Sequence, residues 1–132
     1  MKLLLDTHIW LWSHSDRARL SKRVATALLD EENELWLSPI SVWEFFLLVE
    51  KGRIEVQGGA EAWVEEALSK RPMKEAPLNH HVAMHSRLVR VDHEDPADRF
   101  LAATAAVYDL VLVTEDQRLL RGKGFQVLKP SP

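Results

Sequence analysis

The sequence contains no cysteine, which excludes disulfide bonds and thiolate metal sites. It also lacks internal repeats, low-complexity tracts and any apolar run near the roughly 20 residues that a membrane-spanning helix needs. No charged leader followed by an apolar core and a small-residue cleavage site opens the chain. We therefore expect a cytoplasmic protein with no membrane association.

An excess of positive charge is absent too, because 17 basic and 20 acidic side chains give a formal net charge of -3. Proteins that bind nucleic acid commonly carry a basic field, and the overall composition does not provide one. A local basic cluster can still hold a phosphate backbone. One such cluster comprises Arg17, Arg19, Lys22 and Arg23.

What the chain does contain is the composition of a folded protein, with 46% hydrophobic and 28% charged residues. Its 132 residues fall within the usual size of one domain and suffice to bury a core. We expect residues 1–132 to form a single domain.

Short apolar stretches and helical periodicities alternate along the chain. The pattern predicts strands near residues 3–5, 34–37, 73–76, 110–114 and 125–128, and helices near 21–32, 39–50, 60–69, 79–89, 96–108 and 116–120. Such alternation favours an α/β fold in which helices flank a parallel sheet. The all-apolar stretch Val111-Leu112-Val113 supports this, because a central parallel strand is buried on both faces.

Four carboxylates, far apart in the sequence, stand where a strand ends or a helix presents a face: Asp6, Glu44, Asp98 and Asp116. Asp6 directly follows the first strand, so it lies at the carboxyl edge of the sheet, where α/β proteins bind ligands. Right-handed crossovers place the ends of parallel strands on one side and bring Asp116 toward Asp6. This arrangement predicts a metal-dependent site.

The other two acids, Asp98 and Glu44, could instead have purely structural roles. Asp95 and Asp98 are three residues apart and share a face of a first helical turn, where Asp95 before Pro96 is also a suitable N-cap. For Asp98 we favour a ligand role. Glu44 lies in an otherwise apolar helix, so it is either partly exposed or buried with a cation or hydrogen-bond donors.

Four segments together resemble the PIN-domain family, and more narrowly its VapC-type toxins. They are Leu4-Leu5-Asp6-Thr7-His8, Ser41-Val-Trp-Glu44, His93-Glu-Asp95-Pro-Ala-Asp98-Arg99 and Leu112-Val-Thr114-Glu-Asp116. The resemblance implies a three-layer α/β/α sandwich with a short, mainly parallel sheet. It also implies an endoribonuclease dependent on Mg²⁺ or Mn²⁺, an RNA substrate, a cognate antitoxin protein of a type II toxin–antitoxin pair, and a homodimer.

By that resemblance Asp6, Glu44, Asp98 and Asp116 form the acidic quartet, and Asp95 and Arg99 belong to the extended third motif. Glu115 competes with its neighbour Asp116 for the fourth position.

The residue chemistry agrees with this assignment, because hard divalent cations prefer oxygen ligands and Mg²⁺ takes only one or two carboxylates directly. We hypothesise that Asp6 and Asp98 are the principal ligands, while Glu44 and Asp116 act through water or a second ion. The metal would activate water for in-line attack on a phosphodiester.

The same chemistry predicts accessory roles for other residues. The hydroxyl of Thr7 or Thr114 would orient phosphate or water. Arg99 would pair with an acid or reach the scissile phosphate, with a surface ion pair as the alternative. His93 would order its loop or take part in catalysis.

A zinc site provides a rival hypothesis, because His81 and His85 share a helix face beside His80. No nearby acid or cysteine completes it, so we favour solvated histidines. The tryptophans are expected mostly in the core, and Trp10 and Trp12 have a groove for an antitoxin helix or a dimer surface as the alternative.

Two functions of other classes remain open. A phosphatase with Asp6 as nucleophile would also place this residue after the first strand, but phosphatases of the haloacid-dehalogenase type need a second Asp where this chain has His8. The second alternative is a catalytically silent module whose acids bind an ion or a basic partner. The intact quartet argues against it.

Overall fold

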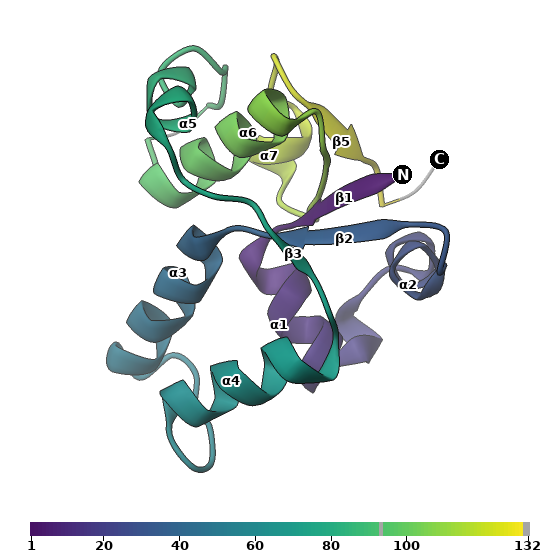
Figure 1. Ribbon diagram of the computed structural model, residues 1–132, viewed down its shortest axis with the longest axis vertical. Coiled ribbons are helices and arrows are strands. Elements are labelled where there is room, and N and C mark those ends of the chain that lie inside the picture. Colours follow the sequence, from purple (N-terminus) through teal and green to yellow (C-terminus); the bar gives the residue numbers. More distant parts are fainter. Residues whose placement is uncertain (93, 131–132) are drawn as a thin grey trace.

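The computed structural model describes residues 1–92 and 94–130, and His93 therefore lies outside the described residues (Figure 1). Its centre is a five-stranded parallel sheet with strand order β3-β2-β1-β4-β5. The strands are β1 (Lys2–Leu5), β2 (Glu34–Leu37), β3 (Lys74–Glu75), β4 (Val111–Val113) and β5 (Gln126–Leu128).

The central position of β1 follows from its composition. Leu3, Leu4 and Leu5 are fully buried, as a parallel strand covered on both faces requires. In the register of the sheet, Leu4 pairs with Trp36 on one side and with Leu112 on the other. The ends of β1 and β4 therefore lie next to each other.

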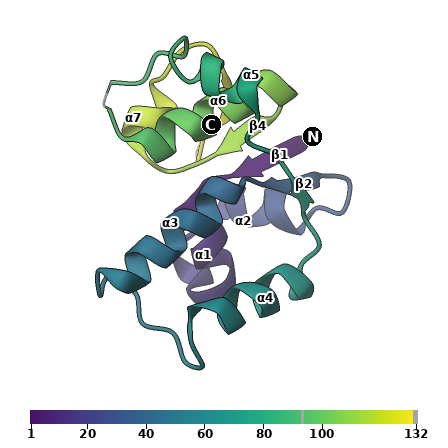
Figure 2. The ribbon, with the colours of Figure 1, turned by 60° about the vertical axis from the view of Figure 1, so that its left-hand side comes forward.

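Helices cover both faces of the sheet, as Figure 2 shows. They are α1 (Thr7–Ser15), α2 (Lys22–Leu29), α3 (Pro39–Glu50), α4 (Ala60–Lys70), α5 (His80–His85), α6 (Pro96–Tyr108) and α7 (Gln117–Leu120), with a 3-10 turn η1 (Arg17–Arg19) after α1. Leu3 and Leu5 pack with residues of α1 to α4 on one face, whereas Leu4 and Leu112 pack with residues of α6 and α7 on the other. The predicted α/β/α sandwich is confirmed.

The predicted strands and helices are present, and the range 34–37 agrees at both ends. Two helices are shorter than predicted: α2 ends at Leu29 and α5 at His85. The sequence prediction missed α1. Its Ile9, Trp10 and Leu11 are consecutive and all buried, so the helix has only a weak polar face and its sequence lacks clear amphipathic periodicity.

The tryptophans do not all lie in the core. Trp10 is fully buried and packs edge-on against Phe45 and Trp63, so the alternative of a groove position is wrong for this residue. Trp12 is only partly buried, and Trp43 is 50% exposed.

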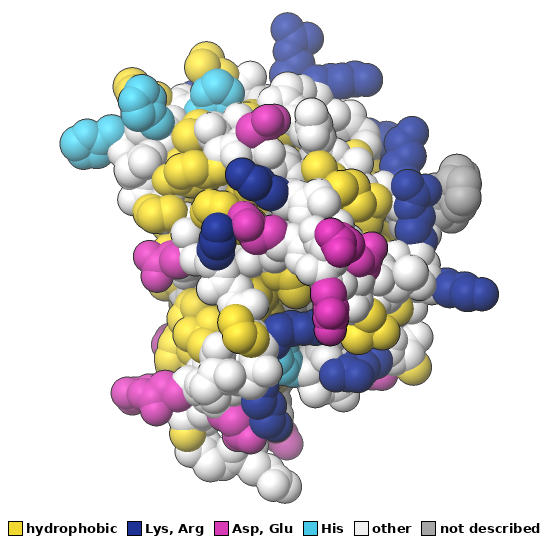
Figure 3. All heavy atoms as spheres, turned by 45° about the vertical axis from the view of Figure 1, so that its right-hand side comes forward, with side chains coloured by type: hydrophobic (Ala, Val, Ile, Leu, Met, Phe, Trp, Pro, Cys, Tyr) yellow, Lys and Arg dark blue, Asp and Glu magenta, His cyan; other side chains and the backbone are white. Residues whose placement is uncertain are grey.

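Acidic, basic and apolar side chains are interspersed on the face that Figure 3 shows. Across the described part of the chain, no helix combines the length and apolar character needed to cross a membrane.

Candidate active site

Asp6 occupies the junction between β1 and α1, and it is 7% exposed. It is the N-cap of α1, where one carboxylate oxygen accepts a hydrogen bond from the backbone N–H of His8 at 2.7 Å. The other oxygen accepts a hydrogen bond from the Thr114 hydroxyl at 2.5 Å. Both oxygens of this buried carboxylate are thus held in place, and Thr114 comes from the end of the neighbouring strand.

Glu44 comes from α3, on the same side of the sheet as α1. Its side chain is partly buried, and this burial raises its pKa, as do the charges of Asp6 and Asp95, while a hydrogen bond with Thr7 lowers it. The Thr7 hydroxyl is also hydrogen-bonded to the Ser41 hydroxyl, with 2.9 Å between the two oxygens. The beginnings of α1 and α3 are therefore joined by buried polar contacts next to Glu44.

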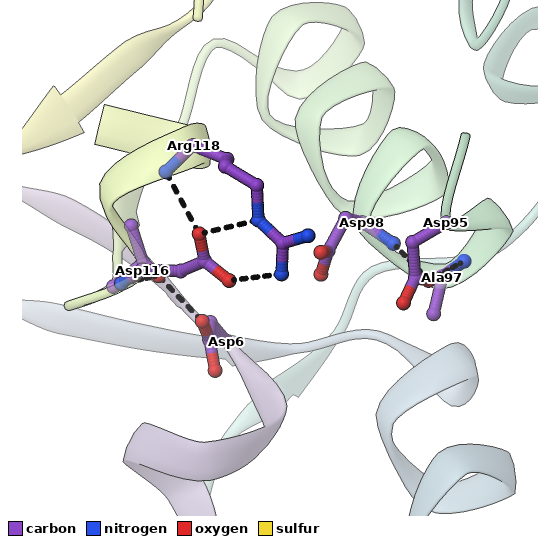
Figure 4. Close-up of polar contacts among 7 residues, drawn as sticks. Asp6, Asp95, Ala97, Asp98, Asp116 and Arg118 are labelled. Atoms are coloured by element: carbon purple, nitrogen blue, oxygen red, sulfur yellow. Dashed lines mark hydrogen bonds and ion pairs between the residues drawn. The ribbon is translucent and has the colours of Figure 1, made fainter. Parts of the chain in front are cut away.

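Asp95 and Asp98 lie at the start of α6 (Figure 4). The Asp95 carboxylate accepts hydrogen bonds from the backbone N–H groups of Ala97 at 2.9 Å and Asp98 at 3.3 Å. The N-cap interpretation of Asp95 is confirmed. The capped turn presents the Asp98 side chain toward the carboxylate of Asp116, which comes from the opposite side of the site.

Asp116 is the N-cap of α7 and accepts a hydrogen bond from the backbone N–H of Arg118 at 2.8 Å. The Arg118 guanidinium also contacts it, through Nε at 3.5 Å and Nη2 at 3.3 Å. Sequence reasoning missed Arg118. An arginine two residues after an N-cap aspartate, at the start of a short helix, was the pattern that could have identified it.

The electrostatics of the site are dominated by Asp98, whose pKa is raised to about 8. Burial is the largest cause, followed by the negative charges of Asp95, Asp6, Asp116 and Glu44. Burial likewise raises the pKa of Asp6, although its hydrogen bonds oppose this. These acids, which come from four separate parts of the chain, thus repel one another.

Asp116 titrates in the opposite direction. Partial burial raises its pKa, but the hydrogen bonds and positive charge of Arg118 outweigh this effect, so the net shift is downward. Glu115 and Asp116 line the same cavity, and Asp116 is among the charges that raise the pKa of Asp98.

The acids line one cavity of about 970 Å³. Beyond them the cavity is lined by α1, α3 and residues 53–57, where apolar residues such as Leu11 and Trp12 alternate with the basic residues Arg19 and Arg53. The guanidinium of Arg19 lies 4.5 Å from the centre of the Trp12 ring. An acidic end thus continues into a surface that carries aromatic and basic side chains together with the acids Asp16 and Glu55.

The donor set of this site suits a hard divalent cation. Its side chains offer carboxylate and hydroxyl oxygens, and their mutual repulsion favours a bound positive charge. Within residues 1–92 and 94–130, no three His, Asp or Glu side chains are already gathered as a ligand set. A cation would therefore have to draw the carboxylates closer together. The histidines of the rival zinc hypothesis include His80 and His81, which are exposed on α5.

Three predicted accessory residues have different contacts from those expected. Arg99 is 7% exposed and donates to the backbone carbonyls of Ser86 at 2.9 Å and Val89 at 3.0 Å, so the alternative of a surface ion pair is wrong, whereas pairing with an acid and contact with the phosphate stay predictions. Thr7 and Thr114 are buried, and their hydroxyls bond protein groups. Thr7 bonds the Ser41 hydroxyl, and Thr114 bonds the carboxylate of Asp6.

The fold and the site together define an α/β/α protein with an acidic cluster at the carboxyl edge of a parallel sheet. The family model described as "PIN domain" matches residues 3–124, and the chain therefore belongs to the PIN-domain family. The resemblance found in the four sequence motifs is confirmed.

Relatives and solved structures agree with this family. The chain is 30% identical over 118 residues to Ribonuclease VapC22 of Mycobacterium tuberculosis (strain ATCC 25618 / H37Rv), a match that covers 89% of this chain and 88% of the relative. It also superposes on a chain of VapBC2 from Rickettsia felis bound to a DNA fragment from the promoter, with a TM-score of 0.73, 17% identity and 98% of each chain covered. A toxin–antitoxin complex from Klebsiella pneumoniae contains a similar chain, with a TM-score of 0.64, 20% identity and 97% of each chain covered.

Proposed function

We propose that this protein is a metal-dependent endoribonuclease and the toxin of a type II toxin–antitoxin pair. The observation that carries the proposal is the single cavity that Asp6, Glu44, Asp98 and Asp116 line together, although they come from four separate parts of the chain. The similarity to Ribonuclease VapC22 supports RNA as the substrate.

The residues proposed to hold the cation are the acidic quartet, with Asp6 and Asp98 as the principal ligands and Glu44 and Asp116 acting at longer range. Mg²⁺ and Mn²⁺ are the ions that an all-oxygen site favours. When bound, such an ion stabilises negative charge on phosphoryl oxygens and lowers the pKa of water.

Neighbouring side chains keep these acids in position. The Thr114 hydroxyl and the His8 N–H each hold one oxygen of Asp6, so the orientation of this carboxylate is fixed before a cation binds. Asp95 caps α6 and thereby fixes the turn that carries Asp98. We assign Thr7, Asp95 and Thr114 positioning roles.

The cavity beside the acids is the proposed RNA-binding surface. Arg19 and Arg53 supply positive charge for phosphates, and the Trp12 ring supplies an aromatic surface on which an unpaired base can stack. Because a duplex hides the faces of its bases, this lining favours single-stranded RNA.

The proposed protein partner is a cognate antitoxin, which the similarity to a chain of a toxin–antitoxin complex supports. We further propose that residues 1–132 act as one nuclease domain, as a homodimer, in the cytoplasm. The exposed Trp43 on α3 provides apolar surface for such contacts.

The test is cleavage of total cellular RNA by purified, antitoxin-free protein in Mg²⁺ or Mn²⁺. Discrete fragments that disappear with EDTA and with Asp98→Asn are expected. Asp92→Asn is the matched control, because Asp92 is an exposed acid nearby that does not line the cavity. This control should cleave like the natural protein.

If no RNA is cleaved, the two alternative functions, a silent binding module and a phosphatase, are distinguished as follows. A folded protein that leaves all RNA intact with both metals would be a silent binding module. A protein that instead releases phosphate from a small phosphomonoester, and loses this activity in Asp6→Asn, would be a phosphatase.

A further inference from the structure

A basic side chain reaches into the acidic cluster from α7. Arg118 contacts Asp116 through its backbone N–H, its Nε and its Nη2. Figure 4 shows its guanidinium between the carboxylates of Asp116 and Asp98. The positive group thus occupies a place where the negative charges of the site converge.

Negative charges around Arg118 stabilise its guanidinium in this position. Its pKa is raised first by the hydrogen bond and charge of Asp116, and further by the charges of Asp98 and Asp95. The guanidinium is therefore stabilised by the same acids that the proposed function assigns to the cation. A guanidinium and a divalent ion next to the same carboxylate repel each other.

We propose that Arg118 is the resident counter-cation of the acidic site and competes with the divalent cation for the place between the carboxylates of Asp98 and Asp116. This inference rests on the proposed function, because it takes the acidic quartet as the cation site. Without the metal, Arg118 offsets part of the negative charge. When the metal binds, the guanidinium moves out of the place between Asp98 and Asp116.

The ion pair is suited to such an exchange because it is open to solvent. The side chain of Arg118 is 52% exposed and that of Asp116 is 29% exposed. Ion pairs of this kind are weak, so a divalent cation can displace the arginine at small cost. The affinity for the metal is lowered by that cost, and Arg118 thereby sets the metal concentration at which the site fills.

Isothermal titration with Mg²⁺ and with Mn²⁺ tests the inference on metal binding alone. Arg118→Gln is expected to bind each ion about 5-fold more tightly than the natural protein. Arg118→Lys keeps the charge but loses the two-point contact. Its affinity for each ion should lie between that of the natural protein and that of Arg118→Gln. Because Arg118 is exposed, these variants should fold, which circular dichroism verifies.

Arg121→Gln is the matched control. It removes the same charge from an exposed residue at the end of α7 that does not line the cavity. Its metal affinity should remain close to that of the natural protein. An equal gain in Arg121→Gln would mean that net charge alone is responsible and would overturn the inference.

The displacement has a spectroscopic readout of its own. The Arg118 Nε–H resonance, identified as the arginine signal missing from Arg118→Gln, should shift as Mg²⁺ is added. A resonance that stays unchanged at saturating metal contradicts displacement.

The outcomes separate this inference from the proposed function. EDTA-sensitive RNA cleavage, combined with equal or weaker metal binding by Arg118→Gln, refutes the role of Arg118 and leaves the nuclease proposal intact. A natural protein that binds neither metal refutes both.

Discussion

The hydroxyl of Thr114 donates a hydrogen bond to the carboxylate of Asp6 at 2.5 Å, between residues 108 positions apart in the chain. The same hydroxyl oxygen accepts a hydrogen bond from the backbone N–H of Asp116 at 3.1 Å. One buried side chain therefore links the first and the last acid of the quartet. The parallel pairing of β1 with β4 makes this link possible.

Replacing Thr114 with Val should reduce RNA cleavage strongly and destabilise the fold. Valine has nearly the same shape but leaves one oxygen of the buried Asp6 without its donor, which costs about 1–3 kcal/mol of unfolding free energy. Urea denaturation and an RNA cleavage assay measure the two effects.

The control for this variant is Thr104→Val. Thr104 is equally buried, but its hydroxyl only donates to the Phe100 carbonyl of its own helix. We expect a stability change below about 1 kcal/mol and normal cleavage. Equal losses of activity in both variants would show that the Thr114 hydroxyl has no special role.

Asp98 should make the metal-free protein less stable as the pH rises. Its folded-state pKa is about 8 against an ordinary 3.8, so the folded state holds a proton that the unfolded state releases between these values. The stabilising contribution is complete below about pH 4 and is lost as the pH rises through about 8. Burial and the neighbouring acids cause this loss.

The Asp98→Asn variant removes the titration and should melt at a higher temperature in EDTA. The difference from the natural protein should grow from pH 4 to pH 8 and reach about 3 °C. Added Mg²⁺ should then raise the melting temperature of the natural protein more than that of the variant. A difference that does not vary with pH in EDTA would contradict the shifted pKa.

Arg99→Met should destabilise the protein without altering the chemistry of the site. The substitution leaves the carbonyls of Ser86 and Val89 without a buried charged donor, at a cost of about 2–4 kcal/mol. Cleavage per folded molecule at low temperature should be normal.

Arg87→Met is the comparison for this change, because Arg87 is exposed and its ion pair with Glu94 spans 3.7 Å. Its cost should be below about 0.5 kcal/mol. If Arg99→Met is fully stable yet inactive, Arg99 acts on the substrate after all.

Arg19→Gln should weaken RNA binding and reduce its salt dependence. Arg19 lines the cavity beside Trp12, whereas Lys22 is exposed on α2 and does not line it. In the Asp98→Asn background, the slope of log affinity against log salt should fall by about 1 for Arg19→Gln and stay constant for Lys22→Gln. The reverse result would move the RNA to the face of α2.

Much of the fold could be predicted because its determinants are local. Apolar runs bounded by polar residues indicate β2 and β4, and Pro96 after the capping Asp95 marks the start of α6. The helix α1 could not be found in this way. Its burial is decided by the later segments that pack around Trp10, and these are far away in the sequence.

Part of the site could also be predicted, because the local sequence indicates where the strands end. The end of a parallel strand indicates where Asp6 and Asp116 lie, because topology alone brings strand ends together. The direction of a long side chain depends on three-dimensional packing. Arg99 therefore turns toward the carbonyls that follow α5, and Arg118 turns into the acids, although both lie beside a quartet residue in the sequence.

The placement of β1 beside β4 also determines when the site can exist during synthesis. Asp6 leaves the ribosome before its partner strand β4 and Asp116, which follow more than a hundred residues later in the chain. A nascent chain arrested before β4 thus carries an incomplete acidic cluster. The growing chain therefore lacks the proposed activity until β4 and Asp116 have been synthesised.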